Sequence, residues 1–340
     1  MTTRHPSISD LLARDAVVVH SKWRFRMQKR IVELNGRTYV LYRFRRKRTK
    51  ARFEDTIRRL EQAGIAIQSI CARTSTFGEY LRHGHWVALS YLPGEPIAKR
   101  VNRAGLVSLG RTIARLNAIE GPPQQALFGA KRPVLPHETY LARDTQLTES
   151  QRRWIRKSHA RLQGLAGAQL THGDLFSGNI IQNDDNSVSL IDYELLAHDL
   201  AGIELAATLL RPFCRTDKRR RILLAAYLAA CSPKLRQAWD VYGRDFLFAA
   251  AARLALARQD RVRHVTRLNR ILAARRLLSR RGEELTGRYE ANLAVIRSAQ
   301  RNEAYYVGMA RTMIELCLVD SETGPLDLLQ LCHQRRAQFR

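Results

Sequence analysis

The segment THGDLFSGNI, residues 171–180, constrains the fold of this chain more than any other part of its sequence. Asp174 is followed five residues later by Asn179, and the next apolar segment, SLIDYE, ends on a second acid, Asp192. The pattern between Asn179 and Asp192 predicts a β-hairpin. Because a hairpin brings the start of its first strand beside the end of its second, we expect these two residues to be neighbours.

These three residues have the chemistry of a phosphoryl-transfer site. Amide and carboxylate oxygens suit Mg²⁺, which takes few protein ligands and completes its coordination with water and substrate phosphates. Asp174, one loop turn away, would accept or orient the proton of an attacking hydroxyl. The residues therefore predict a metal held by Asn179 and Asp192, with Asp174 as the catalytic group.

The stretch from His172 to Glu194 follows, without a gap, the pattern H-G-D-x-x-x-x-N, an apolar strand and I-D-[FYW]-[ED]. It resembles the aminoglycoside phosphotransferase family, which shares the protein-kinase-like fold with choline kinases and lipopolysaccharide core sugar kinases. The resemblance implies a bilobal α+β fold. Residues 1–92 would form a small, β-rich, nucleotide-binding N-lobe, and residues 93–340 a larger, mainly helical C-lobe with the catalytic loop and metal-binding hairpin.

The resemblance gives the same roles to the three residues above and adds supporting ones. His172 would brace the catalytic loop without titrating. In HDLAGIELA, Asp199 and Glu204 would support the loop, although Glu204 stands where an aspartate is usual. Without the resemblance, both acids would be interpreted as helix caps or surface groups.

The segment WVALSYLPGEPI resembles the connection between the two lobes of that family. The adenine ring lies against this backbone in the family. The resemblance therefore implies that Ser90, Tyr91 and Leu92 contact the nucleotide.

The N-lobe departs from the family pattern at the cation that holds the α- and β-phosphates. In YVLYRFRRKR the usual lysine position holds Tyr42. Arg43 is the first candidate replacement, but strand alternation turns it to the opposite face unless a bulge or a shifted register intervenes. Arg45 is the alternative. Glu54 is nearest to the expected position of the paired helix acid, with Glu61 as the second choice.

No glycine-rich loop is visible in VVVHSKWRFRMQKR. Together with the uncertain cation, this leaves open a non-catalytic homologue that binds nucleic acid or an anionic membrane. The intact catalytic set favours the enzyme.

Local patterns predict a β-rich start and a helical remainder after residue 101. Asn35 and Gly36 predict a two-residue hairpin turn. A further turn is expected at residues 183–186, and the catalytic loop would follow a helix that ends near Leu170. The other expected elements are helices at 7–15 and 50–63, and strands at 17–25, 26–34, 37–45, 65–72, 79–84 and 85–92.

The net charge of +27 favours anionic partners. Seven of the ten residues from Arg43 to Arg52 are cationic. A second cationic stretch, residues 257–281, carries an apolar stripe at helical spacing, which we expect to pack in the core. The stripe consists of Val262, Val265, Leu268 and Leu272. Aromatic residues do not alternate with these cations, which disfavours single-stranded nucleic acid.

These features predict an enzyme that moves the γ-phosphoryl group of ATP, with GTP as an alternative, to a hydroxyl group. It would use Mg²⁺. The acceptor would be a small molecule, sugar or glycolipid, and its expected charge is negative. The five scattered cysteines and the absence of an apolar leader predict a cytoplasmic protein, peripheral at the inner membrane face if the acceptor is a glycolipid.

Overall fold

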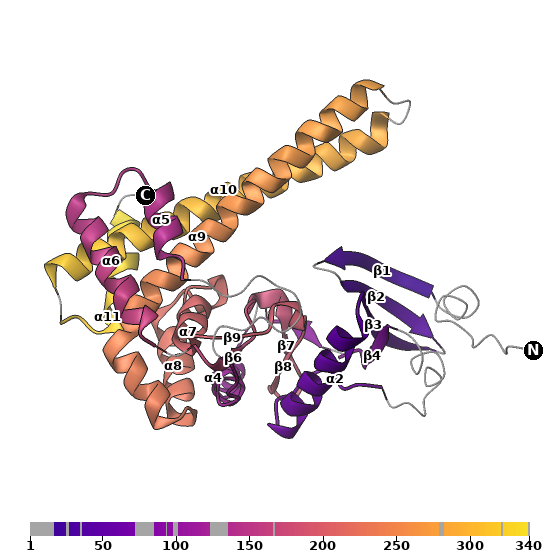
Figure 1. Cartoon of the computed structure of the whole chain (residues 1–340), viewed down its shortest axis with the longest axis horizontal. Coiled ribbons are helices and arrows are strands. Elements are labelled where there is room, and N and C mark those ends of the chain that lie inside the picture. The colour runs from indigo at the N-terminus through magenta and orange to yellow at the C-terminus, as the bar shows by residue number, and fades with distance from the viewer. Residues whose placement is uncertain are drawn as a thin grey trace, which may run out of the picture. The chain divides into compact units, whose positions relative to one another are not determined.

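The computed structural model describes residues 17–24, 27–34, 36–71, 85–92, 94–97, 101–122, 135–165, 167–278, 282–320 and 322–338 (Figure 1). The chain forms two compact units. Unit 1 consists of Met1–Pro133, Ala166–Glu204 and Arg211–Pro233, and unit 2 of Val134–Leu165, Leu205–Leu210 and Lys234–Arg340. Unit 1 thus combines the N-terminal sheet with the catalytic segment, and the functional division at residues 92 and 93 stays a prediction. The helix expected at 7–15 and the strand expected at 79–84 lie outside the described residues.

The N-terminal sheet of unit 1 is antiparallel, with the strand order β1-β2-β3-β4. Its strands are β1 (Val17–Arg24), β2 (Met27–Leu34), β3 (Arg37–Phe44) and β4 (Trp86–Ser90). The pairing of β2 with β3 runs without a bulge from Leu34 opposite Arg37 to Met27 opposite Phe44. Gly36 takes a φ of 69° in the connecting turn, which confirms the predicted hairpin.

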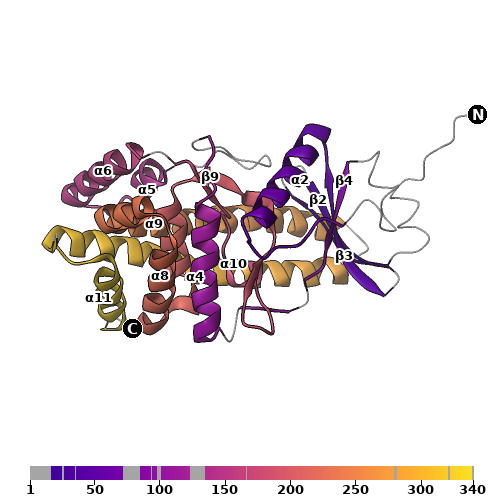
Figure 2. The same cartoon turned by 90° about the horizontal axis from the view of Figure 1, so that it is seen from below.

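Opposite residues of this sheet share a face, so the sheet has two distinct sides. Val32, Leu41 and Trp86 lie on one side and belong to a buried apolar cluster. Tyr42 and Phe44 lie on the other side, where α2 covers them (Figure 2). The ring of Phe53 on α2 lies 5.2 Å from that of Tyr42 and 5.1 Å from that of Phe44.

Helix α2 (Lys47–Gln62) begins three residues before the predicted start and ends before Gly64, as expected. Gly64 has a φ of 66°, a conformation that glycine adopts without strain. The helix turns a buried stripe toward the sheet, formed by Phe53, Thr56, Ile57 and Leu60.

The strand predicted at residues 65–72 is wrong as a continuous element. Ile67 forms an isolated parallel bridge with Leu190, and Ile70 an isolated antiparallel bridge with Leu89. The segment therefore divides its hydrogen bonds between two different sheets, which prevents a regular ladder. It joins the N-terminal sheet to the catalytic hairpin.

The catalytic hairpin consists of β7 (Ile180–Gln182) and β8 (Val188–Leu190), with β5 (Glu95–Pro96) on the outer side of β7. A two-stranded sheet pairs β6 (Gln169–Thr171) with β9 (Ala197–Asp199). The expectation of a helix running to Leu170 is wrong, because α6 (Glu149–Gln163) ends earlier and β6 leads into the loop.

Two helices of unit 1, α4 (Arg103–Asn117) and α8 (Asp217–Ala230), lie side by side (Figure 2). Gly110 permits this close approach, since a Cβ atom there would lie 2.6 Å from the Leu223 carbonyl oxygen. Helix α7 (Ala201–Leu209) begins in unit 1 and continues into unit 2, and the 3₁₀ turn η3 (Pro212–Cys214) precedes α8.

Unit 2 is helical. Besides α6 it contains α5 (His137–Arg143), α9 (Pro233–Leu278), α10 (Gly282–Val319) and α11 (Pro325–Gln338), and α9 and α10 lie side by side over much of their length (Figure 1). The expected core stripe on α9 is only partly buried. Val265 is buried, whereas Leu268 is 41% exposed, and the side chain of Leu272 lies outside the described residues. Over the described residues, no helix has the length and apolar character needed to cross a bilayer.

Candidate active site

The loop after β6 depends on Gly173, whose φ is 79°. A Cβ atom at this position would lie 2.5 Å from the Leu195 carbonyl oxygen. Both the left-handed backbone and the close approach require glycine, so the G of the HGD motif is set by sterics. The loop then passes Asp174 and enters the 3₁₀ turn η1 (Ser177–Asn179).

Glu204 on α7 holds this loop in place through a hydrogen bond to its backbone. Its Oε1 accepts a hydrogen bond from the Gly173 backbone N–H at 2.8 Å, and its Oε2 accepts one from Asn117 Nδ2 at 3.5 Å. Asn117 in turn donates to the Leu170 carbonyl oxygen and accepts from the Tyr227 hydroxyl. Burial raises the pKa of Glu204 to about 7, although both donors oppose that shift. Because the carboxyl is buried, it is not a surface group, and its bonds support the loop-supporting role.

His172 connects the loop to the end of the hairpin. It is fully buried, and its Nε2–H donates to the Ile191 carbonyl oxygen at 2.9 Å. Burial lowers the pKa of His172, so the ring is held neutral. Asp199, on β9, accepts a hydrogen bond from the Leu200 backbone N–H through its Oδ1. The His172 bond supports the predicted bracing role, whereas the role of Asp199 as a support of the loop stays a prediction.

The hairpin brings Asn179 and Asp192 to one end, as expected from its topology. The Ile191 backbone N–H donates to the Asn179 carbonyl oxygen at 3.0 Å, one residue before Asp192. Asn179 also donates from Nδ2 to the Asp174 carbonyl oxygen at 3.0 Å, which fixes the direction of its amide. Asp192 has a φ of 67°, so the backbone turns sharply at this residue.

The same end of the hairpin fits a magnesium ion. Asp192 Oδ1 is buried and has no hydrogen-bond partner among the described residues, as expected for an atom that serves as a cation ligand. In the part of the chain that the structure describes, no three His, Cys, Asp or Glu side chains gather in a metal-binding cluster. Two protein ligands from Asn179 and Asp192 are the arrangement that Mg²⁺ bound with phosphates would use.

Two cations approach the acidic groups, and the sequence analysis missed both. Arg211 Nη2 lies 3.7 Å from Asp174 Oδ1, with only 9% of its side chain exposed. Lys29 Nζ lies 3.7 Å from Asp192 Oδ1. A signal for Lys29 was present, because the turn at Gly36 sets it opposite Tyr42. No local pattern pointed to Arg211, which follows α7.

Arg43, the predicted phosphate-binding cation, lies on the face of the sheet opposite to Tyr42. Its guanidinium stacks over the Trp86 ring, 5.7 Å from the centroid. The pairing of β2 with β3 contains no bulge or register shift that would turn the Arg43 side chain to the face of Tyr42. Glu54 is 3.8 Å from Lys50, its neighbour on α2. The structure therefore does not bring Arg43 to Asp192, and it gives Glu54 a different cation.

The predicted adenine-binding segment follows β4. Ser90 already uses both backbone groups within the fold: its N–H donates to the Ser69 carbonyl oxygen, and its own carbonyl oxygen accepts from Gln68 Nε2. Tyr91 is 47% exposed and donates its N–H to the Thr38 carbonyl oxygen at 3.3 Å. Of the three predicted contacts, Tyr91 is exposed, whereas Ser90 and Leu92 are both half-buried.

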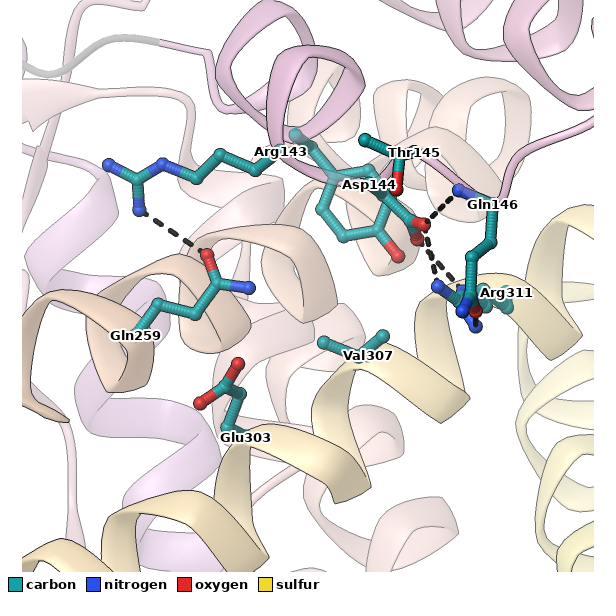
Figure 3. Close-up of a pocket in the computed structure, with 9 residues that line it drawn as sticks. Arg143, Asp144, Thr145, Gln146, Gln259, Glu303, Val307 and Arg311 are labelled. Carbon is teal, nitrogen blue, oxygen red and sulfur yellow. Dashed lines mark hydrogen bonds and ion pairs between the residues drawn. The ribbon is translucent and has the colours of Figure 1, made fainter.

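Unit 2 contains a separate polar pocket of about 270 Å³ (Figure 3). It is lined by Arg143, Asp144, Gln259, Glu303 and Arg311, among others, and by none of the predicted site residues. Asp144 accepts two hydrogen bonds from Arg311, at 2.6 and 2.8 Å, so these charges satisfy each other.

Residues 15–244 match the model of a phosphotransferase enzyme family. Over 121 residues the chain is 28% identical to a probable SapB synthase of Streptomyces coelicolor, a match that covers 34% of this chain and only 12% of that much longer protein.

Similar solved structures include a spectinomycin phosphotransferase in complex with ADP and spectinomycin, which is 12% identical. The match covers 96% of this chain and 98% of that one, with a TM-score of 0.50. A macrolide 2'-phosphotransferase from Brachybacterium faecium is 18% identical, with 74% and 90% of the chains covered and a TM-score of 0.46. An ethanolamine kinase from Plasmodium vivax is 13% identical, with 70% and 74% covered and a TM-score of 0.42. The first of these structures confirms the predicted α+β kinase-like fold.

Proposed function

Since the chain belongs to the phosphotransferase enzyme family, we propose that it transfers the γ-phosphoryl group of ATP, bound with Mg²⁺, to a hydroxyl group of a small molecule or sugar. GTP is the alternative donor. The observation that carries this proposal is the meeting of Asp174, Asn179 and Asp192 around one end of the hairpin. The fit of Asp192 Oδ1 to a cation supports the metal.

In this mechanism Asp174 accepts the proton of the acceptor hydroxyl and orients its oxygen. Arg211, whose Nη2 lies 3.7 Å from Asp174 Oδ1, adds positive charge where phosphoryl oxygens would gather. Asn179 and Asp192 would hold the metal, which when bound neutralises phosphate charge. His172 and Glu204 keep the loop at a fixed distance from the hairpin. Positioning of this kind supplies most of the catalysis, because phosphoryl transfer has a loose transition state.

Nucleotide binding is expected to require Mg²⁺, and Asp192→Ala should abolish the metal-dependent part of the affinity. The reason is that the substitution removes one of two protein ligands. Isothermal titration calorimetry with ATP, in Mg²⁺ and in EDTA, measures both effects. Asp185→Ala is the matched control, since Asp185 lies at the exposed turn of the same hairpin.

Equal nucleotide affinity of the wild-type protein in Mg²⁺ and EDTA would contradict the metal assignment. The alternative function is a non-catalytic protein that binds nucleic acid or an anionic membrane through its basic surface. It would be favoured if no nucleotide bound under either condition, while nucleic acid or anionic vesicles did.

The acceptor, in this proposal, is anionic. Arg46, Lys47 and Arg48 are exposed at the N-terminus of α2, whose first turn contains no acidic residue. Cations at this end of a helix oppose its dipole, so an anion there relieves an unfavourable arrangement. A phosphorylated sugar or a glycolipid at the inner membrane face would meet this requirement.

Replacing Arg46, Lys47 and Arg48 together by glutamine is expected to raise the KM for an anionic acceptor and to weaken its dependence on salt. Exposed charges act over only about 8–10 Å at physiological ionic strength, so the effect should be local. Steady-state kinetics across ionic strength provides the measurement. The triple change of Arg261, Arg263 and Arg267 to glutamine, on exposed positions of α9, removes the same charge elsewhere. If both triple variants change KM and its salt dependence equally, only the net charge of the protein affects acceptor binding. The proposed anion site at the N-terminus of α2 would then be wrong.

A further inference from the structure

The third strand cannot supply the phosphate-binding cation from its usual position. Tyr42 stands there, fully buried against Phe53. A tyrosine side chain carries no positive charge in either of its protonation states. Its hydroxyl oxygen has no hydrogen-bond partner among the described residues. A nucleotide's phosphates would therefore meet no positive charge from residue 42.

The neighbouring strand provides a cation at the same level. Lys29 on β2 is paired with Tyr42 on β3, so both side chains project from the same face of the sheet. The Lys29 ammonium lies over the Tyr42 ring, 5.7 Å from its centroid. It ends 3.7 Å from Asp192 Oδ1. The Lys29 side chain thus passes over the Tyr42 ring and approaches Asp192, the predicted metal ligand.

The geometry of Lys29 and Asp192 is more typical of a ligand-binding site than of a structural salt bridge. A separation of 3.7 Å exceeds the usual 2.7–3.2 Å of a direct hydrogen bond between nitrogen and oxygen. The side chains of Lys29 and Asp192 are 17% and 21% exposed, although the Oδ1 atom of Asp192 is itself buried. By contrast, the pair of Arg161 with Asp245 in unit 2 has a 2.6 Å contact.

We propose that Lys29 is the residue that binds the nucleotide's α- and β-phosphates, replacing from β2 the cation that the fold normally carries on β3. This assignment rests on the proposed function. Arg43 cannot compete, because it lies on the other face of the sheet over Trp86. An anion beside Lys29 would also lie beside Asp192, one of the two residues that would hold the metal.

The test measures the affinity of the Lys29→Met protein for ATP, ADP and adenosine by calorimetry in Mg²⁺. Loss of a charge-assisted phosphate contact should weaken ATP and ADP binding by about ten- to a hundredfold. Adenosine lacks phosphates, so its affinity should match that of wild type. Lys29→Arg keeps the charge and should recover part of the lost affinity. Arg43→Met, the matched control from the opposite face, should bind all three ligands as wild type does.

Three results would overturn the assignment, and they differ in what they say about the proposed function. Unchanged ATP affinity in Lys29→Met would reject Lys29 alone and leave the phosphotransferase intact. Equal losses for ATP and adenosine would show that Lys29 only supports the fold of the site. Failure of the wild-type protein to bind any of the three ligands would reject both the assignment and the proposed function.

Discussion

Replacing Asp174 by asparagine is expected to lower kcat by about 10²–10⁴-fold, because the amide cannot accept the proton of the acceptor hydroxyl. Nucleotide affinity should stay close to that of wild type. Asn179 bonds to the Asp174 backbone and not to its carboxylate, so the loop keeps its hydrogen bond after the substitution. Steady-state kinetics with a turned-over acceptor, together with calorimetry for ATP, separates the two effects.

The control for this experiment is Asp185→Asn, which removes an acid from the hairpin turn and leaves the site unchanged. Activity of the Asp174→Asn protein within a few-fold of wild type would show that Asp174 does not carry the reaction. A matching fall in ATP affinity would mean that its carboxylate also binds the nucleotide or the metal. The contact with Arg211 provides a second check, since Arg211→Met should lower kcat while leaving a folded protein that still binds ATP.

Glu204 is expected to contribute a fall in the free energy of unfolding as the pH rises from 4.5 to about 7. The pKa of this carboxyl is raised by burial from its ordinary 4.5 to about 7 in the folded protein. Between these pH values the folded state binds more protons than the unfolded chain. The contribution of Glu204 to the free energy of unfolding is therefore fully present below pH 4.5. It decreases by up to about 3 kcal/mol as the pH rises through 7.

Glu204→Gln isolates this contribution, because glutamine stays neutral and can still accept the Gly173 N–H bond. The difference in unfolding free energy, variant minus wild type, should rise by about 3 kcal/mol between pH 4.5 and about pH 8. Urea denaturation at a series of pH values measures it. Glu95→Gln changes an exposed acid on β5 and should give a flat difference. A flat difference for Glu204→Gln as well would mean that the buried carboxyl is ionised at no cost to folding.

The sequence alone determined those parts of the protein in which short-range chemistry decides the structure. The Asn-Gly pair in the sequence predicted the pairing of β2 with β3, which runs without a break from Leu34 opposite Arg37. The hairpin pattern between Asn179 and Asp192 predicted that these two residues are neighbours, since a hairpin places the start of its first strand beside the end of its second. The left-handed backbone at residue 173, with a φ of 79°, is a local reason for the glycine of the HGD motif.

Elements that depend on distant partners were not determined locally. The segment at 65–72 has the composition of a strand, but its neighbours come from two different sheets, and it forms only isolated bridges. The apolar stripe on α9 predicted core packing, yet Leu268 faces solvent because burial depends on which partner helix covers it.

Alternation in β3 did place Arg43 on the face away from Tyr42, and the regular register left no bulge to reverse it.

The charges around the site were decided by tertiary structure. Lys29 reaches Asp192, and Arg211 reaches Asp174, across long stretches of sequence that carry no mark of the pairing. Glu204 gained its raised pKa from the helices and loop that bury it, not from its neighbours in the chain. Local patterns fix where a side chain points along its own strand or helix. Only packing of the elements against one another decides which charge it meets and how much water remains between them.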